Sequence, residues 1–454
     1  MSDNSFNHKL VKKLIHAEKT EALKGLLKEL DSVEIANSLL QLKLKHQLLV
    51  LENLSKEVAS EVLAHLQNSS PILEGIVSQM NSGRLGEIIE EMDGDDAADM
   101  VSILEESKAE EVLETLPTKD REEITNLMQY HEESAGGIMN PVVVSVGKDQ
   151  TVKEAVNGIR DLIEKEELET FYAVYVVDEY QHLIGMVTVP ILLLAEQENL
   201  IKNLMNPNVV AVDVDMDQEA VARIAQEYDL VVIPVIDKYL KLIGRITIDD
   251  LMDVLHEEYH EDIAHIAGTG GEEVLETSVL RTSRDRLPWL ILGLGGGFLA
   301  ALAMSEYESM LTDLPQVMYF MPLIAALGGN IAIQSSSIVV RGLGTGEIRT
   351  GDLLQRLWKE LRVGMLNGPV CALILFLMVW TITTDVKLGM ITGIALIAVV
   401  MLAASVGSTI PILLKRINID PAIATGPFIT TANDLLGILI YLSVTFSILG
   451  TSLI

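Results

Sequence analysis

Cysteine is nearly absent from this sequence, since its 454 residues include only Cys371. A single thiol cannot form a disulfide within the chain. Basic residues are also scarce, with 33 Lys and Arg against 65 Asp and Glu, and the net charge is −32. So acidic a chain would repel nucleic acid, and no nucleic-acid-binding signature is present.

The first 20 residues are polar and lack the apolar core of a signal peptide. We therefore expect the N-terminal half to stay in the cytoplasm.

Long apolar runs dominate the second half of the chain. Residues 287–454 carry nine acids and eight bases, so 31 of the 32 net negative charges lie in residues 1–286. A membrane helix needs about 20 apolar residues. Five stretches satisfy this, four of them uncharged (287–305, 314–340, 363–384 and 388–414) and a fifth that follows Asp420 with Asp434 as its single charge. We predict an α-helical membrane domain of five spans over residues 286–454.

The loops between these runs differ in charge. Basic residues precede the first span and lie between the second and third and between the fourth and fifth, whereas the opposite loops hold only Lys387. By the positive-inside rule the N-terminus is cytoplasmic and the C-terminus is outside. We expect a multi-pass protein of the plasma or inner membrane.

Residues 1–136 are rich in Leu, Glu, Lys and Ala at helical spacing. This pattern predicts an all-α domain, built as a superhelix of short helix pairs. It indicates no function by itself.

An internal repeat follows. "MNPVVVSV" at 139–146 returns as "MNPNVVAV" at 205–212, and "YVVDEYQHLIGMVTV" at 175–189 returns as "PVIDKYLKLIGRITI" at 234–248. Each copy is predicted to form a short strand, an amphipathic helix and two further strands. The repeat resembles a tandem pair of α/β CBS domains, over 137–200 and 201–254, which pack as a pseudo-two-fold unit and often sense adenine nucleotides or ions.

The second copy contains a further motif of that family. Thr247 and Asp250 match the Thr-x-x-Asp pattern that holds a ribose in many CBS domains, whereas the first copy has Thr188 and Ile191 in these places, without the acid. The resemblance therefore implies a weakened nucleotide site, with ATP as its ligand.

Several motifs together indicate one family. "YHEESAGGIMNP" joins the helical domain to the repeat, "PLIAALGGNIAIQSSS" lies in the second span, and "DPA", "GPF" and "ND" mark the fifth. With the order of its parts, the chain resembles the MgtE family of magnesium transporters over nearly its whole length. The resemblance implies a homodimeric, Mg²⁺-selective channel or transporter for magnesium uptake, with an acidic connecting (plug) helix at 255–285. It implies no enzyme.

Asp434 is the candidate selectivity residue. Mg²⁺ prefers oxygen ligands, binds one or two carboxylates and keeps several waters. If a helix starts near Pro427, one of its faces carries Gly426, Thr430, Asp434, Gly437 and Tyr441. In a two-fold dimer, two copies of Asp434 would face one conduit. The alternative is that Asp434 is the N-cap of the helix, since Asp favours caps.

The second span offers amides to the same path. Asn330 and Gln334 are one helical turn apart and are costly in a membrane unless they face a partner or water. We predict that Asp434, Asn330, Thr430 and Gly426 line the pathway. For Gln334, a hydrogen bond between helices is an alternative.

Acidic residues in the cytoplasmic half are candidate regulatory sites. The family resemblance implies Mg²⁺ binding at Asp95, Asp99, Asp217, Glu219, Asp229, Asp250, Asp253, Glu258, Glu261 and Asp262. Bound Mg²⁺ would neutralise acidic faces and close the pore, as negative feedback. The alternatives are a solvated acidic surface and, for Asp217 and Glu219, stabilisation of a helix N-terminus.

Two further motifs match functional patterns only in part. "HEEYH" at 256–260 fits the H-E-x-x-H zinc pattern, yet it lies on the connecting helix, where His256 and His260 could form a secondary zinc site. "GLGGG" at 293–297 lies in the first span, where we expect it to serve close helix packing.

The alternative function for the whole chain is a membrane-anchored sensor of Mg²⁺ or nucleotide that transports nothing.

Overall fold

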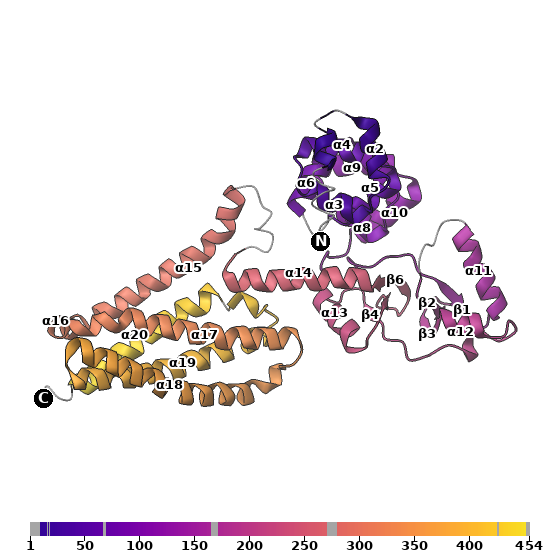
Figure 1. Ribbon diagram of the computed structural model, residues 1–454. Coiled ribbons are helices and arrows are strands. Elements are labelled where there is room, and N and C mark those ends of the chain that lie inside the picture. Colours follow the sequence, from indigo (N-terminus) through magenta and orange to yellow (C-terminus); the bar gives the residue numbers. More distant parts are fainter. Residues whose placement is uncertain are drawn as a thin grey trace. The chain divides into compact units, whose positions relative to one another are not determined.

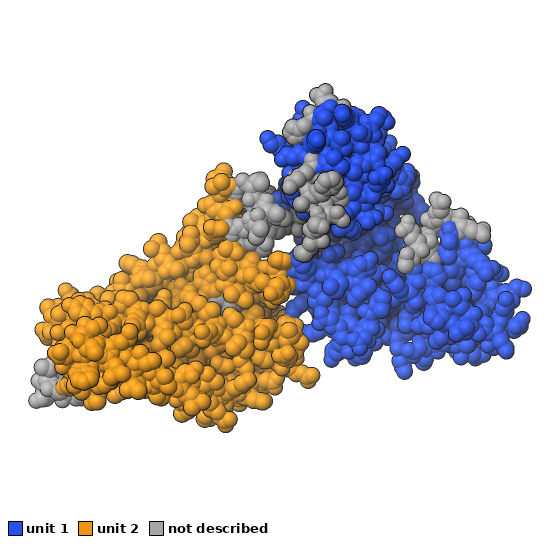
Figure 2. Space-filling model, in the orientation of Figure 1, with its two compact units in different colours: residues 1–258 blue, residues 259–454 orange. Residues whose placement is uncertain are grey.

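The computed structural model describes residues 10–15, 17, 19–66, 70–164, 171–269, 279–424 and 426–450. They form two compact units, residues 1–258 and 259–454 (Figure 2). The first unit holds the short helices and the small sheets, and the second holds the long apolar helices (Figure 1). The predicted multidomain architecture is confirmed.

Short helices form the first part of unit 1. They are α2 (Thr20–Leu27), α3 (Ser32–Leu39), α4 (Leu44–Glu52), α5 (Lys56–Ala64), α6 (Ser70–Gln79), α7 (Ser82–Ile89), α8 (Gly94–Ser102), α9 (Glu106–Thr115) and α10 (Thr118–Leu127). Their apolar residues, three or four positions apart, share one core in which Leu39, Leu63 and Ile88 are fully buried. Helices two apart in the chain pack on one another, as α3 does on α5 and α7 on α9. This packing produces the predicted array of short helices.

Two three-stranded sheets follow, one in each copy of the repeat. The first copy contains β1 (Ser145–Gly147), α11 (Val152–Glu164), β2 (Ala173–Val177), β3 (Leu183–Thr188), α12 (Val189–Leu194) and η2 (Ile201–Asn203), and the second contains β4 (Val212–Asp213), α13 (Gln218–Glu227), β5 (Val232–Ile236) and β6 (Leu242–Thr247). In each sheet the first strand is parallel to the second, and the third is antiparallel to it. The predicted order of strand, helix and two strands is confirmed.

The two copies exchange their Met-Asn-Pro segments. Asn140 of the first copy makes two backbone hydrogen bonds with Arg245 in β6, at 2.8 and 2.9 Å. Asn206 of the second copy makes the equivalent pair with Met186 in β3, at 2.9 and 3.0 Å. Each copy thus adds a backbone segment to the other copy's sheet.

α14 (Ile248–Ala267) begins directly after β6. It ends before Gly268, whose φ of +71° lies in the left-handed region that favours glycine after a helix. The connecting helix predicted for 255–285 therefore begins at Ile248, inside the second repeat. Residues 270–278 of that prediction lie outside the described residues, and the next helix begins at Val279.

Unit 2 is a bundle of apolar helices. Its elements are α15 (Val279–Ser305), α16 (Glu308–Asp313), η3 (Pro315–Phe320), α17 (Met321–Gly344), η4 (Thr350–Asp352), α18 (Leu353–Thr383), α19 (Val386–Arg416), η5 (Ala422–Ala424) and α20 (Pro427–Gly450). Five segments are long and apolar enough to cross a membrane: Thr282–Ser305, Pro315–Gly344, Thr350–Thr383, Val386–Arg416 and Pro427–Ile448. This confirms the predicted five spans.

Glycines set the closest approaches between these helices. A Cβ atom at Gly296 would lie 1.8 Å from the Cγ2 atom of Thr431, so α15 touches α20 there. A Cβ atom at Gly407 of α19 would lie 2.4 Å from the carbonyl oxygen of Ala332 in α17. Small residues allow such contacts between membrane helices. The helix-packing interpretation of "GLGGG" is confirmed at Gly296.

Candidate functional site

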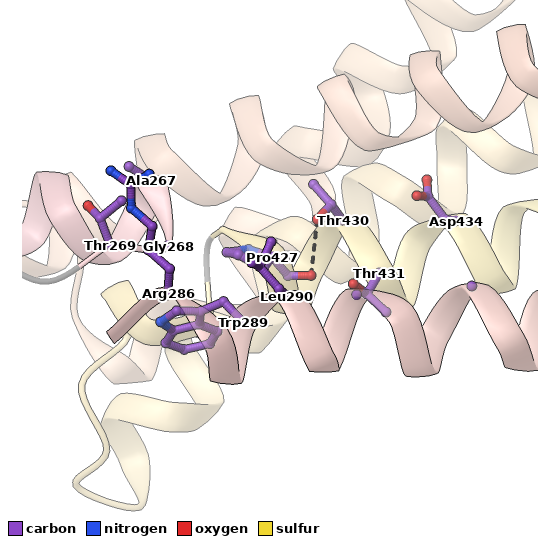
Figure 3. Close-up of a pocket in the computed structure, with 12 residues that line it drawn as sticks. Ala267, Gly268, Thr269, Arg286, Trp289, Leu290, Pro427, Thr430, Thr431 and Asp434 are labelled. Carbon is purple, nitrogen blue, oxygen red and sulfur yellow. Dashed lines mark hydrogen bonds between the residues drawn. The ribbon is translucent and has the colours of Figure 1, made fainter. Parts of the chain in front are cut away.

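Asp434 lies within α20, two turns after the helix begins at Pro427. It is therefore not an N-cap, and that alternative is wrong. Its side chain lines a cavity of about 730 Å³ to which α15, α20 and the end of α14 contribute (Figure 3). The other lining residues are Ala267, Gly268, Thr269, Arg286, Trp289, Leu290, Gly293, Gly297, Pro427, Thr430 and Thr431. Asp434 is the acidic member of this set.

Thr430 lies one turn before Asp434 and lines the same cavity. Its hydroxyl donates to the carbonyl oxygen of Pro427 at 3.0 Å (Figure 3). It also lies 3.2 Å from the carbonyl oxygen of Gly426, to which it donates as well. Because the proton is engaged by the helix itself, the hydroxyl oxygen is left as an acceptor toward the cavity.

α17 contributes two glycines opposite this part of α20. The Oδ1 atom of Asp434 lies 3.9 Å from the position of a Cβ atom on Gly329. The next residue, Asn330, and Gln334 one turn later are both exposed, as Asp434 is. The structure thus places the acid beside α17 and leaves the two predicted amides unburied.

The predicted face of α20 does not continue along its length. Gly426 is buried, and a Cβ atom there would lie 2.5 Å from the carbonyl oxygen of Ile266 in α14. Tyr441 is fully buried and donates to the carbonyl oxygen of Val317 at 3.0 Å. Gly437 is also buried. Tertiary packing therefore limits the shared cavity-lining face to Thr430 and Asp434, and the other three positions pack against protein.

The end of α14 is bonded to the segment that precedes α20. The Nδ1 atom of His265 lies 3.0 Å from the Oδ2 atom of Asp420. The hydrogen bond with Asp420 raises the pKa of His265. Burial alone would raise the pKa of Asp420, but hydrogen bonds from His265 and the Ala422 backbone lower it. A Cβ atom at Gly268 would lie 2.5 Å from Pro427, so this end of α14 also touches the start of α20.

Two acids of unit 1, the buried Asp95 and the half-buried Asp250, lie near enough for their charges to interact. Asp95, in the first turn of α8, is 7% exposed, and its Oδ1 atom has no hydrogen-bond partner within the described chain. Burial and the charge of Asp250 raise its pKa. Burial also raises the pKa of Asp250 to about 6, although two hydrogen bonds from Thr247 oppose the shift. Two carboxylates in such a place need a proton or a cation between them.

Asp99, one turn after Asp95, has a second set of acidic neighbours. Asp99 keeps an exposed surface, but the protein atoms around its carboxyl group raise its pKa, and the charges of Asp96, Glu257 and Glu132 add to the shift. Glu257 lies on α14 and Glu132 follows α10. The predicted acids of α8 thus approach acids of two other segments of unit 1.

The remaining predicted acids are more dispersed. Asp217 caps α13, accepting from the backbone N–H of Glu219 at 3.0 Å, so its helix-end role is confirmed. Glu258 accepts from Gln218 of α13 at 2.8 Å, and Asp229 has a φ of +53°. Asp250, Asp253, Glu258, Glu261 and Asp262 extend along about 18 Å of α14.

No three His, Cys, Asp or Glu side chains lie close enough together to hold a metal ion, in the part of the chain that the structure describes. His256 and His260 therefore have no third ligand there. Within the described residues, the predicted acids of α8 and α14 lie as pairs and neighbours and form no larger cluster.

Three residues of the site were not among the predicted ones. Asn433 is buried beside Asp434, and His265 pairs with Asp420. Asn433 and Asp420 belong to the motifs "ND" and "DPA", which is the signal that could have indicated them. The exposure of Asp434 and the burial of Asn433 result from packing between helices, and no local sequence pattern indicates them.

An acid in a cavity of a bundle with five helices able to cross a membrane, on a chain that also carries a paired α/β module, is the arrangement expected of a membrane transporter for cations. The chain belongs to the MgtE family: residues 321–444 match MgtE, described as a divalent cation transporter, and residues 30–133 match the MgtE intracellular N domain. Residues 135–196 and 201–257 each match a CBS domain.

Known relatives extend over most of the chain. It is 33% identical over 432 residues to the magnesium transporter MgtE of Thermus thermophilus, covering 94% of both chains. It is 35% identical to the magnesium transporter MgtE of Enterococcus faecalis, over 71% of this chain and 70% of that one. A crystal structure of the cytosolic domain of the Mg²⁺ channel MgtE in complex with ATP is similar to 54% of this chain, over 98% of its own length, with a TM-score of 0.50 and 34% identity.

Proposed function

We propose that this chain carries Mg²⁺ across the membrane, into the cell, along a path past Asp434. The observation that supports the proposal is the carboxylate of Asp434 in a cavity of about 730 Å³. Six waters occupy about 180 Å³ at their liquid volume, so the cavity has room for a hydrated Mg²⁺. An acid that contacts the ion through its waters suits a cation that loses its hydration reluctantly.

We further propose that the transporter is a homodimer. Asp434, Asn330 and Gln334 are exposed on the single chain, within helices that cross the membrane. Polar groups in such segments are costly against lipid and therefore face protein or water. A second copy related by a two-fold axis would cover them and add its own Asp434 to the conduit.

Regulation by Mg²⁺ is part of the same proposal. Burial raises the pKa of both Asp95 and Asp250, the charge of Asp250 adds to the shift at Asp95, and Asp95 has an oxygen atom without a partner in the described chain. A divalent cation would remove this repulsion and favour the conformation in which the two acids are close. We propose that this conformation is the closed one, so that high cytoplasmic Mg²⁺ closes the path. The N-terminus would then lie inside the cell, as the basic loops indicate.

ATP is a second proposed ligand, bound by unit 1. Thr247 and Asp250 carry the ribose-binding pattern, and the similar cytosolic domain was solved with ATP. In this chain the two residues also bond to each other, since the Thr247 hydroxyl donates to Asp250 at 2.6 Å. ATP binding and Mg²⁺ binding would therefore share Asp250.

The test is Mg²⁺ flux into proteoliposomes. The unaltered chain should carry Mg²⁺, and Asp434→Asn should reduce the flux about tenfold or more, because each subunit loses its charge on the ion's path. Asp385→Asn is the matched control, since Asp385 caps α19 away from the cavity. Undiminished flux in Asp434→Asn would contradict the proposed path. Absence of flux in the unaltered chain would favour a sensor without transport.

A further inference from the structure

Asn433 is the polar side chain that α20 buries next to Asp434. It is fully buried, and neither its Nδ2 nor its Oδ1 atom has a hydrogen-bond partner within the described residues. The amide lies over Gly328 of α17, where a Cβ atom would come within 2.7 Å of Nδ2 and 3.0 Å of Val399 Cγ1. The side chain is thus enclosed where α17, α19 and α20 meet.

An unpaired amide is unfavourable in this environment. Membrane interiors offer no water, so polar groups there need partners within the protein. Several buried polar side chains of the bundle have them: Tyr441 donates to Val317, Thr392 to Gly389 and Ser335 to Glu360. The hydroxyls of Ser336 and Thr445 have no partner within the described residues, but each leaves one polar atom unpaired, whereas the amide of Asn433 leaves two. A leucine would occupy a similar space without an unpaired polar group. We infer that the amide obtains its partners in another conformation.

The position of Asn433 indicates what those partners are. Consecutive residues of a helix point about 100° apart, so the amide of Asn433 and the carboxylate of Asp434 diverge from neighbouring points of α20. On α17 they face Gly328 and Gly329, which have no side chains to obstruct movement. A shift or rotation of α20 against α17 would therefore bring the amide to the cavity wall, beside the carboxylate.

We propose that Asn433 is a second polar ligand on the ion pathway, used in the conducting conformation. Its carbonyl oxygen accepts a hydrogen bond from a water of the hydrated cation, and its NH₂ group donates to the Asp434 carboxylate. In the present conformation the amide is withdrawn over Gly328. The inference rests on the proposed function, because it assigns a contact to the transported ion.

The first experiment compares Asn433→Leu with Thr445→Val in Mg²⁺ flux assays. Thr445 is the matched control, because it is also fully buried on α20 and its hydroxyl also has no partner within the described chain. Asn433→Leu should lower the flux about tenfold, the effect of losing one hydrogen bond to a charged ligand, and should melt no lower than the unaltered protein. Thr445→Val should transport normally. Asn433→Gln, which keeps the amide, should transport better than Asn433→Leu.

A second experiment measures exposure of the position directly. Asn433→Cys is combined with Cys371→Ser, which removes the chain's own thiol, and a charged methanethiosulfonate reagent is added with or without Mg²⁺. Modification should be faster without Mg²⁺, when the conducting conformation is favoured, and slow at saturating Mg²⁺. This readout does not depend on the stability of the leucine variant.

The outcomes separate the inference from the function on which it rests. Normal flux in Asn433→Leu, or equal protection of the introduced thiol in both conditions, would overturn the role of Asn433 alone. Absence of flux in the unaltered chain would overturn the proposed function and the inference with it. A loss of flux that Thr445→Val reproduces would overturn the inference too, because general packing of α20 would then be responsible.

Discussion

His265 and Asp420 join the end of α14 to the segment before α20, with 3.0 Å between Nδ1 and Oδ2. Asp420→Asn should weaken this link by about 1 kcal/mol or less, because both groups are partly exposed to water. The pKa of His265 is raised above its ordinary value of 6.5, so its contribution is complete below that pH and is lost as pH rises through the folded-state value. The pKa of Asp420 is lowered from its ordinary value of 3.8. The ion pair is therefore also lost at low pH, as the pH falls through this lowered folded-state value.

Melting temperatures measure this effect. The difference between the unaltered chain and Asp420→Asn should be larger at pH 6 than at pH 9. An equal difference at both pH values would contradict the link.

Asp95→Asn should stabilise the Mg²⁺-free chain by about 1–3 kcal/mol, because it removes a buried charge that lies near Asp250. It should also reduce the rise in melting temperature that Mg²⁺ produces. Glu110→Gln is the control, since Glu110 is an exposed acid of α9. A destabilised variant with an unchanged Mg²⁺ response would contradict the paired-acid site.

The same pair predicts a pH dependence without Mg²⁺. The pKa of Asp250 rises from 3.8 to about 6 on folding. The folded chain therefore holds a proton that the unfolded chain releases, and stability falls as pH rises from 3.8 to 6. Thermal melts across this range should show the fall, and saturating Mg²⁺ should reduce it. A stability that rises over the range would show that other groups dominate.

Gly296→Ala should destabilise the membrane bundle by about 1–3 kcal/mol, because the added methyl group would overlap Thr431 on α20. Gly297→Ala is the matched control, since no atom lies within 4 Å of the place that its Cβ atom would occupy; it should be neutral or slightly stabilising. Melting in detergent measures both. Adding Thr431→Ala to Gly296→Ala should restore stability, and failure to do so would place the clash elsewhere.

Glu360→Ala should be more harmful than Ser335→Ala. Glu360 is buried in α18, pairs with Arg356 at 2.8 Å and accepts from Ser335 of α17 at 2.8 Å. Its removal leaves the guanidinium group unpaired, at a cost of about 3–5 kcal/mol, whereas Ser335→Ala loses about 1 kcal/mol. Combining Glu360→Met with Arg356→Met should recover most of the loss. Equal effects of the two single changes, measured as melting temperatures in detergent, would contradict this.

Features that depend on local pattern were predictable from the sequence. The five spans follow from apolar runs, and the paired sheets follow from the repeat. Asp434 was conspicuous because it is charged within an apolar helix. The Thr247-x-x-Asp250 pattern is compatible with a ribose site and also with the N-terminus of a helix. The structure shows the second arrangement at the start of α14, where the Asp250 carboxylate accepts from the Thr247 backbone N–H at 3.0 Å, as in a capping box.

Features that depend on packing between distant segments were not predictable. Asp95 and Asp250 are 155 positions apart in the sequence, and no periodicity indicates that they meet. The burial of Asn433 depends on a glycine about 100 residues earlier, at position 328. Tyr441 shares the helical face of Asp434 yet bonds to Val317, because the bundle closes around it.

The exchange of backbone segments between the two repeat copies limits how this protein can be divided. Asn140 belongs to the first copy by sequence but pairs with β6 of the second, and Asn206 does the reverse with β3. A gene cut between the copies would separate each sheet from one of its bonding partners. The pair, and not the single copy, is therefore the smallest unit that recombination could move to another protein intact.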